Sequence, residues 1–212
     1  MRILLADDHK MMRDGLRALL EKEGWQVVGE AADGHEAVAL ARRLRPDVVV
    51  MDISMPKLNG IDATRRMVAE SRGLKVVALS MNADRRYVVA MFEAGAVGYL
   101  LKNSASDELI QAVRAVAGDL TYVSPSIAAM VVGNVVGAAG PVAKPEHPLS
   151  PRERQVLQLL AEGHSSKEIA SRLDLAVPTV ETHRRQIMDK LNLRTIAELT
   201  KYAIREGLTS ID

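Results

Sequence analysis

The sequence contains no cysteine, which excludes disulfide bonds and thiolate zinc sites and suits a reducing compartment. It also contains no apolar run that approaches the roughly 20 residues needed for a membrane-spanning helix. The N-terminus turns acidic at Asp7, which is too soon for a secretory signal peptide. We therefore expect a cytoplasmic protein.

Excess charge of either sign is also scarce. The 212 residues include 28 Lys and Arg against 27 Asp and Glu, which gives a formal net charge of +1. This balance argues against a surface coated with basic charge, so any nucleic-acid site must be local. The length favours one or two domains, each able to bury a core.

The first half of the chain alternates strands and helices. The segment Val48–Met51 is apolar and rich in β-branched residues, as expected of a strand that is buried on both faces. Strands are predicted at 2–6, 26–31, 48–52, 76–80 and 98–102, and helices at about 11–24, 33–44, 60–72, 84–94 and 104–117. Alternation of this kind predicts an α/β domain over residues 1–120, with a doubly wound, five-stranded parallel sheet covered by helices on both faces.

The candidate chemistry of this half lies at the carboxyl ends of the predicted strands, at Asp7, Asp8, Asp52, Ser80 and Lys102. Because these ends share one edge of a parallel sheet, we expect the side chains to lie together. Crowded carboxylates repel one another unless a cation such as Mg2+ is present. That ion and Lys102 would also neutralise a phosphoryl group on Asp52. One aspartate at a strand end can merely begin a loop, but the whole set favours a site.

Several motifs of this half resemble those of receiver domains from two-component signalling. They are Asp7-Asp8, Met51-Asp52, Met55-Pro56 with Gly60, Ala78-Leu79-Ser80 and Gly98-Tyr99-Leu100-Leu101-Lys102. The resemblance implies that Asp52 accepts phosphate from a sensor histidine kinase. It implies that Asp8, Asp52 and the backbone carbonyl of Ser54 bind Mg2+, with Asp7 helping through water. It also implies that Lys102 grips the phosphoryl oxygens, that Ser80 turns inward to hydrogen-bond the phosphate, and that Tyr99 follows as its aromatic partner.

The middle of the chain, residues 121–147, is predicted to be a linker. A short helix could occupy 125–136, where apolar residues recur at near-helical spacing, and 137–148 is rich in Gly and Pro and aperiodic. The pairs Val131-Val132 and Val135-Val136 could instead cover the receiver or a partner protomer. The role of 124–147 stays open at this point.

The last part, residues 148–212, predicts a small all-α domain of four helices. Three helix starts carry capping boxes, at Ser150-x-x-Glu153, Ser165-x-x-Glu168 and Thr195-x-x-Glu198. The third helix begins near Pro178 and has Val180, Ile187 and Leu191 as its core stripe. Short helices joined by a tight turn predict a helix-turn-helix.

The third helix carries a local cluster of basic residues, and Arg and Thr can contact base edges in a major groove. A basic helix face is often only solvated, but the turn and the capping favour DNA binding. The segments 149–157, 167–170 and 179–183 resemble the LuxR-type helix-turn-helix, and the whole chain then resembles the NarL/FixJ class of response regulators. The candidate DNA contacts are Lys167, Thr179, Glu181, Thr182, His183, Arg184, Arg185, Lys190 and Arg194. Two residues depart from that family, Asp174 where Gly is common and Ala176 where Ser is common.

This resemblance implies a transcription factor rather than an enzyme, controlled by phosphorylation of Asp52 and active as a homodimer. Its implied partners are a sensor histidine kinase, promoter DNA with inverted half-sites, and RNA polymerase. The implied dimer contact is the helix at 195–206, with Thr195, Leu199 and Tyr202. Two rivals are a haloacid-dehalogenase-like phosphatase, which would need an aspartate where Ser54 stands, and a binding module that never takes phosphate.

Overall fold

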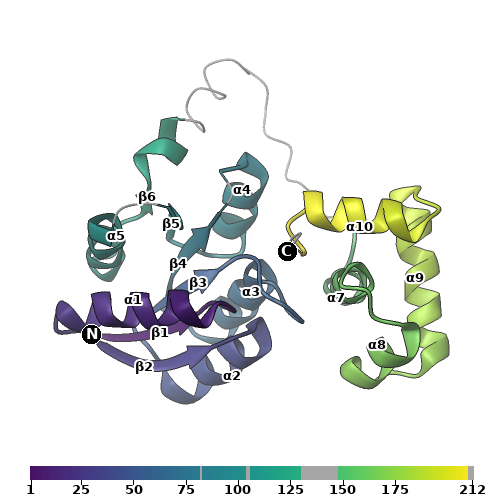
Figure 1. Ribbon diagram of the computed structural model, residues 1–212, viewed down its shortest axis with the longest axis horizontal. Coiled ribbons are helices and arrows are strands. Elements are labelled where there is room, and N and C mark those ends of the chain that lie inside the picture. Colours follow the sequence, from purple (N-terminus) through teal and green to yellow (C-terminus); the bar gives the residue numbers. More distant parts are fainter. Residues whose placement is uncertain (82, 104–105, 130–147, 210–212) are drawn as a thin grey trace. The chain divides into compact units, whose positions relative to one another are not determined.

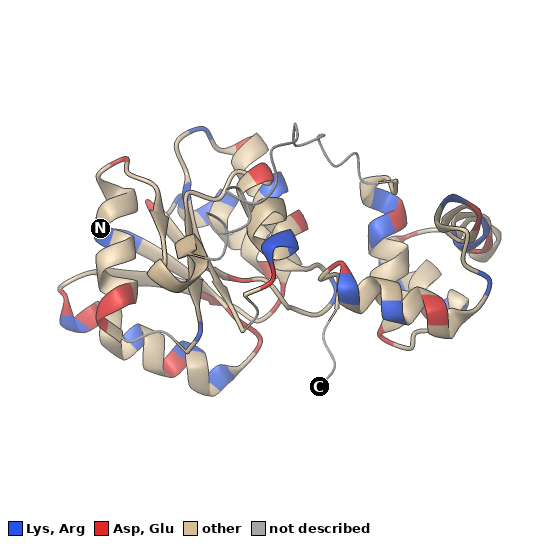
Figure 2. Ribbon diagram, turned by 90° about the horizontal axis from the view of Figure 1, so that it is seen from above, with Lys and Arg blue, Asp and Glu red and all other residues tan. Residues whose placement is uncertain are grey.

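The computed structural model describes residues 1–81, 83–103, 106–129 and 148–209 (Figure 1). The chain divides into two compact units, Met1–Gly140 and Pro141–Asp212. After the families that their sequences resemble, we call them the receiver unit and the DNA-binding unit, and we describe them separately. None of the helices in the described ranges is both long and apolar enough to cross a membrane. Basic and acidic residues are interspersed along the helices of both units, in keeping with the balanced charge (Figure 2).

The receiver unit is built on a parallel sheet with strand order β2-β1-β3-β4-β5-β6 (Figure 1). The strands are β1 (Arg2–Ala6), β2 (Gln26–Ala31), β3 (Val48–Asp52), β4 (Lys75–Ser80), β5 (Gly98–Leu101) and β6 (Tyr122–Val123). The first five confirm the predicted sheet. The sixth was not predicted, because two residues are too few to form a recognisable pattern.

Helices cover both faces of this sheet, as a doubly wound fold requires. On one face, α1 (Lys10–Lys22) and α5 (Ser106–Ala117) pack against the side chains of Ile3, Leu5 and their neighbours. On the other face, α2 (Gly34–Leu44), α3 (Gly60–Glu70) and α4 (Arg85–Glu93) enclose a second core around Leu4, Val49 and Met51. Every residue of β3 is buried, which explains its continuous run of apolar residues.

Local sequence sets the loops beside the carboxyl end of β3. Asn59 caps α3 by accepting a hydrogen bond from the Asp62 N–H at 2.9 Å. Gly60 follows because a Cβ at that position would lie 2.0 Å from the carbonyl oxygen of Asp52. Glycine at this position therefore lets the start of α3 lie closer to the end of β3 than a residue with a Cβ atom would allow.

Residues 125–129, which follow β6, are helical, and Ile127 is fully buried in the core shared with Leu4 and Val49. The first residues of the predicted helix at 125–136 therefore contribute to the core of the receiver unit. The remainder of that prediction, including the pairs Val131-Val132 and Val135-Val136, lies outside the described residues.

The DNA-binding unit contains α7 (Pro151–Ala161), α8 (Ser166–Leu173), α9 (Val177–Leu191) and α10 (Ile196–Arg205). All three predicted capping boxes are formed, at the starts of α7, α8 and α10. Buried side chains from the four helices, among them Leu157, Ile169, Val180, Ile187 and Leu199, form one core. This confirms the predicted four-helix domain with a helix-turn-helix.

Candidate functional site

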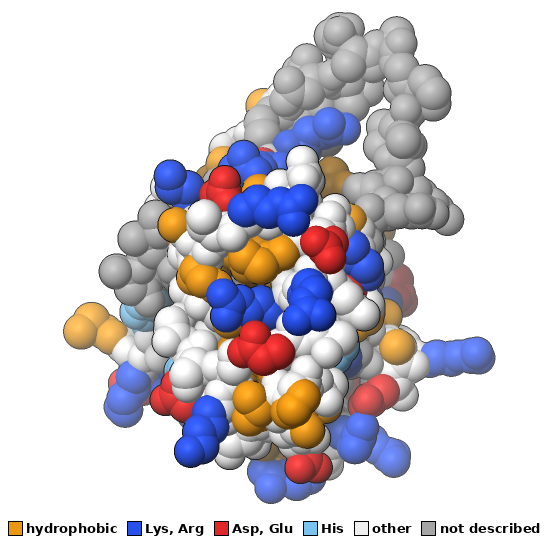
Figure 3. Space-filling model, turned by 90° about the vertical axis from the view of Figure 1, so that its right-hand side faces the viewer, with side chains coloured by type: hydrophobic (Ala, Val, Ile, Leu, Met, Phe, Trp, Pro, Cys, Tyr) orange, Lys and Arg blue, Asp and Glu red, His pale blue; other side chains and the backbone are white. Residues whose placement is uncertain are grey.

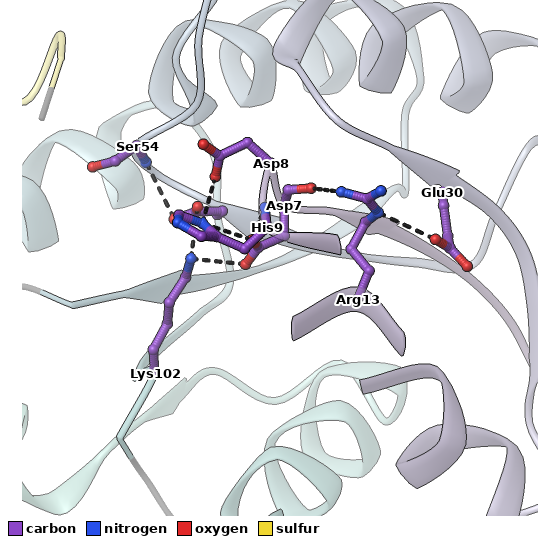
Figure 4. A network of polar contacts seen from close by, with 8 residues as sticks. Asp7, Asp8, His9, Arg13, Glu30, Ser54 and Lys102 are labelled. Carbon is purple, nitrogen blue, oxygen red and sulfur yellow. Dashed lines mark hydrogen bonds and ion pairs between the residues drawn. The ribbon is translucent and has the colours of Figure 1, made fainter. Parts of the chain in front are cut away.

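The carboxyl ends of β1, β3 and β5 bring Asp7, Asp52 and Lys102 into direct contact. Figure 4 shows Lys102 beside Asp7. Asp7 is 1% exposed and Asp52 is 2% exposed. The ammonium of Lys102 lies 2.7 Å from Asp7 Oδ2 and 2.7 Å from Asp52 Oδ2. The predicted meeting of carboxylates and an ammonium at one edge of the sheet is therefore present.

Burial shifts the pKa values of the charged groups at this edge of the sheet. Desolvation raises the pKa of the Asp52 carboxyl from 3.8 to about 7, with a further contribution from Asp7, and Lys102 only partly opposes them. Burial alone would lower the pKa of Lys102, but Asp52 and Asp7 together raise it above its ordinary value. Lys102 therefore stays charged, and the carboxylates favour additional positive charge at this site.

The loops around this edge hold the carboxylates in position (Figure 4). The N–H of His9 donates to Asp7 Oδ1 at 2.9 Å, and the N–H of Ser54 donates to Asp52 Oδ1 at 3.2 Å. Arg13, on α1, donates to the carbonyl oxygen of Asp7 at 2.5 Å and to the carboxylate of Glu30 at 3.1 Å. The sequence prediction did not include His9 or Arg13. The position of His9, immediately after two aspartates, is the signal that could have identified it.

The donor set at this edge fits a divalent cation. One ligand atom from each of Asp7, Asp8, His9 and Asp52 can be chosen so that all four lie within 4.8 Å of one another. The oxygens Asp7 Oδ2 and Asp8 Oδ1 are shielded from solvent, and their close neighbours are the Lys102 ammonium at 2.7 Å and the His9 Nδ1 atom at 2.9 Å. Clustered carboxylate oxygens suit a hard cation, and receiver domains bind Mg2+ at such an acidic cluster.

Ser80 and Tyr99 form a second, buried polar pair beside this edge. Ser80 ends β4 and is 3% exposed, and Tyr99 lies on β5 with its side chain fully buried. The two side chains are hydrogen-bonded, and burial raises the pKa of Tyr99 to about 12. Tyr99 is therefore inside the core and neutral, with its hydroxyl group directed to the end of β4.

The candidate DNA contacts lie mainly on α9, and the turn before this helix determines how it begins. Asp174 ends α8 with a φ of 52°, the conformation that glycine adopts most easily. Ala176 is the N-cap of α9 and offers no side-chain hydrogen bond. Lys167, Thr179, Glu181, Thr182 and Arg185 are exposed.

Several of these side chains already have partners within the unit. Glu181 accepts a hydrogen bond from Ser166 and lies 3.9 Å from Arg184, which is partly buried. Thr182 donates to the carbonyl of Pro178 at 2.9 Å. Arg194 lies 3.5 Å from Asp189, and both are exposed. Figure 3 shows the face that lies on the right in Figure 1, where basic side chains lie among acidic and hydrophobic ones.

Three predicted residues have environments that the sequence did not indicate. The ammonium of Lys190 lies 2.7 Å from the carboxylate of Glu153, which is 3% exposed, so Lys190 pairs with a buried carboxylate of α7 although its own side chain remains partly exposed. His183 is partly buried, with its Nδ1 atom shielded from solvent. Leu199 is fully buried in the core, so its side chain offers no surface to a second copy of the chain, contrary to the expected dimer contact.

The other two expected dimer residues retain some exposure. Thr195 is exposed and caps α10, where its hydroxyl group donates to the Glu198 carboxylate at 2.9 Å. Tyr202 is partly buried and packs against the core of the unit.

Comparison with known proteins identifies both units. The family described as response regulator receiver domain matches residues 3–114, and the family described as bacterial regulatory proteins, luxR family, matches residues 147–203. The transcriptional regulatory protein MctR of Rhizobium johnstonii is 40% identical over 210 residues, which cover 99% of this chain and 95% of that protein. The oxygen regulatory protein NreC of Staphylococcus carnosus is 39% identical over 214 residues, which cover 98% and 99% respectively.

Among solved structures, the chain is similar to RcsB of Salmonella enterica serovar Typhimurium bound to the promoter rprA in the presence of the phosphomimetic BeF3−. The TM-score is 0.62 at 28% sequence identity, and the match covers 95% of this chain and 97% of that one. A receiver domain implies a histidine kinase as partner, and a LuxR-type helix-turn-helix implies promoter DNA. The chain belongs to the response regulators of the NarL/FixJ class, in which a receiver domain is joined to a LuxR-type DNA-binding domain that regulates transcription.

Proposed function

We propose that Asp52 is the phosphoacceptor of this response regulator and that its phosphorylation controls dimerisation and DNA binding. The observation that carries the proposal is the buried Asp52 carboxylate, 2.7 Å from Lys102 at the edge where oxygens of Asp7 and Asp8 converge. An oxygen of Asp52 attacks the phosphorus of a phosphohistidine on the kinase. The nitrogen–phosphorus bond breaks, the histidine leaves with the electron pair and regains a proton, and an acyl phosphate forms on Asp52.

The neighbouring side chains have distinct roles in this transfer. Asp8, Asp52 and the Ser54 carbonyl would hold Mg2+, with Asp7 acting through water, and the bound ion would supply positive charge to the phosphoryl oxygens. Lys102 contacts both Asp7 and Asp52 in this structure. After phosphoryl transfer its ammonium would form an ion pair with a phosphoryl oxygen.

Ser80 and Tyr99 would carry the signal away from Asp52. The Ser80 hydroxyl has a single proton, so when it donates to a phosphoryl oxygen it can no longer donate to Tyr99, and its hydrogen bond with Tyr99 has to rearrange. The Lys102 N–H donates to the Ser80 carbonyl at 2.8 Å, so the ends of β4 and β5 move together. Phosphorylation then shifts the population between two arrangements of this edge.

In the DNA complex, α9 would lie in the major groove with its exposed face toward the bases. Arg185 can pair with guanine, Thr179 and Thr182 can meet a thymine methyl group, and the Glu181 carboxylate can accept from N4 of cytosine. The phosphate groups of the DNA backbone would be contacted by the remaining candidates, Lys167, His183, Arg184, Lys190 and Arg194. A dimer would present two such helices to inverted half-sites about 34 Å apart, and RNA polymerase is a further candidate partner.

The proposed dimer contact is the exposed part of α10, with Thr195 and Tyr202. Ile196 supports this assignment, because it is a large apolar residue that is 38% exposed beside Thr195. Reversing the charge of the exposed Lys201 on α10 should weaken DNA affinity steeply and leave phosphorylation unchanged, whereas Lys22→Glu on α1 should change neither. If Lys201→Glu binds DNA normally, the dimer forms elsewhere.

The decisive experiment measures DNA binding with and without acetyl phosphate and Mg2+ at one fixed salt concentration. The duplex is first selected by the wild-type protein from a random pool, because no operator is assumed. Wild type, Asp52→Asn and the exposed control Asp14→Asn are then compared, and intact mass shows which chains carry the phosphoryl group. Fixed salt matters because contacts to phosphates make affinity strongly salt-dependent.

Tighter binding in wild type and Asp14→Asn, but not in Asp52→Asn, would support the switch and its residue together. Equal DNA affinity in all conditions would mean that the protein binds DNA but that phosphorylation of the receiver does not control this binding. Continuous release of inorganic phosphate with rapid turnover would instead favour a phosphatase.

A further inference from the structure

The side chain of His9 lies beside the carboxylates of Asp7 and Asp8. Its Nδ1 atom lies 2.9 Å from Asp8 Oδ1 and 3.5 Å from Asp7 Oδ1. A ring nitrogen of His9 and one oxygen each of Asp7, Asp8 and Asp52 lie within 4.8 Å of one another. Two ligand atoms on opposite sides of one divalent ion are about 4–5 Å apart, so the four groups can share an ion.

The backbone fixes His9 in this place. His9 is the N-cap residue of α1, and its side chain makes no capping hydrogen bond to that helix. Its N–H donates to Asp7 Oδ1 at 2.9 Å, which turns the chain so that the ring lies beside Asp7 and Asp8 (Figure 4). The side chain is 63% exposed, and its ring lies against the carboxylates of Asp7 and Asp8. The ring is therefore free of the packing and capping tasks that would hold it away from an ion.

An imidazole nitrogen changes which ions a carboxylate site prefers. Mg2+ takes oxygen ligands almost exclusively and retains several waters, so a nearby imidazole adds little to its affinity. Divalent transition ions such as Co2+ accept carboxylate oxygens and imidazole nitrogen together. A site made of carboxylates alone would lack this second kind of ligand.

We propose that His9 is a direct ligand of the ion at this site and makes it select divalent transition ions over Mg2+. The inference deepens the proposed function, because it rests on the cation site formed by Asp8 and Asp52. It assigns His9 a role in metal selectivity, while Asp52 remains the residue that takes the phosphoryl group.

The test compares the dissociation constants of Co2+ and Mg2+ for the untagged, full-length protein at pH 7.5, measured by calorimetry. The variants are His9→Ala, which removes the ring, and His9→Asn, which can still cap α1 but has no ring nitrogen. The matched control is His35→Asn, a histidine on α2 outside the group of four. We expect both His9 variants to bind Co2+ about tenfold or more weakly, the order of loss found when metal sites lose supporting groups, with Mg2+ affinity changed less than about twofold.

A second measurement identifies the ligand directly. Coordination of Co2+ by a histidine shifts the exchangeable ring N–H proton far outside the normal range of the proton NMR spectrum. This signal should be present in wild type and His35→Asn and absent in His9→Ala, His9→Asn and Asp8→Asn. Asp8→Asn is included because it removes a carboxylate of the same site.

The outcomes separate this inference from the proposed function. If Mg2+ binds wild type but the ratio of the two dissociation constants is unchanged in the His9 variants, His9 is only an exposed partner of Asp8 and the inference is overturned. Persistence of the shifted N–H signal without His9 would overturn it equally. If wild type binds neither ion, the cation site of the proposed function fails as well.

Discussion

Replacing Asp52 by asparagine should stabilise the receiver unit when no divalent ion is present, and the gain should depend on pH. The carboxyl of Asp52 is almost fully buried and has a pKa of about 7 in the folded protein, whereas an ordinary carboxyl has 3.8. Between these two pH values the folded state holds a proton that the unfolded chain has lost. The stability of wild type therefore falls as pH rises from about 4 to about 7 and then levels off.

The pKa of Asp52 sets the size of this effect. The difference between 3.8 and about 7 corresponds to at most about 4 kcal/mol in the free energy of unfolding at pH 8. Asparagine resembles the protonated carboxyl in shape but gives Lys102 a weaker acceptor, so we expect a net gain of about 2 kcal/mol at pH 8. The gain should be clearly smaller at pH 5, where the folded wild type is still protonated at Asp52.

Urea unfolding in EDTA at several pH values, followed by the fluorescence of Trp25, measures this gain. Trp25 is the single tryptophan of the sequence and packs against the core beneath α1 and α5, so the full-length chain reports on the receiver unit alone. For the exposed control Asp14→Asn, the difference in the free energy of unfolding from wild type should not increase between pH 5 and pH 8. Excess Mg2+ should stabilise wild type and leave Asp52→Asn almost unchanged. A gain that is the same at pH 5 and pH 8, or larger at pH 5, would refute this account of the buried charge.

Three further predictions concern the DNA-binding unit, observed as its own calorimetric transition. Ala176→Ser should supply the N-cap hydrogen bond that α9 lacks and raise stability by about 1 kcal/mol; an unchanged or lower melting temperature would contradict this. Asp174→Gly should also stabilise, by about 1 kcal/mol, because the residue has a φ of 52°; destabilisation would mean that the aspartate side chain contributes more than the backbone strain costs. Glu153→Gln should destabilise by about 1–3 kcal/mol at pH 7. Burial alone would raise the pKa of Glu153, but hydrogen bonds from Lys190 and Ser150 hold the pKa below 4.5. The stability advantage of wild type over Glu153→Gln should therefore be lost only as pH falls below 4.5.

The edge of the sheet that carries the site could be predicted because its residues lie at strand ends. The sequence pattern shows where each strand ends, and the carboxyl ends of parallel strands lie at one edge of the sheet. Asp7, Asp52 and Lys102 follow such ends and are therefore expected to lie together, as they do. The capping boxes were predictable for a similar reason, since Ser150 and Glu153 interact across one turn of the same helix.

Features that depend on tertiary packing could not be predicted in this way. Lys190 lies 37 residues from Glu153, and no local pattern indicates that its ammonium pairs with that buried carboxylate. The apolar face of α10 is recognisable, but whether Leu199 faces its own core or a second chain depends on how α10 packs in the unit. The ring of His9 is near the carboxylates only because the backbone turns at Asp7.

The short strand β6 has a consequence for how this chain can be divided. It covers the outer edge of β5, where Tyr122 N–H donates to the Val97 carbonyl and Ser124 N–H donates to the Tyr99 carbonyl. A fragment cut at residue 120 would expose that edge as a row of unpaired donors and acceptors, the kind of template on which chains aggregate. It would also remove Ile127 from the core. A fragment that extends through residue 129 keeps the edge covered and should remain monodisperse at concentrations where the shorter one associates.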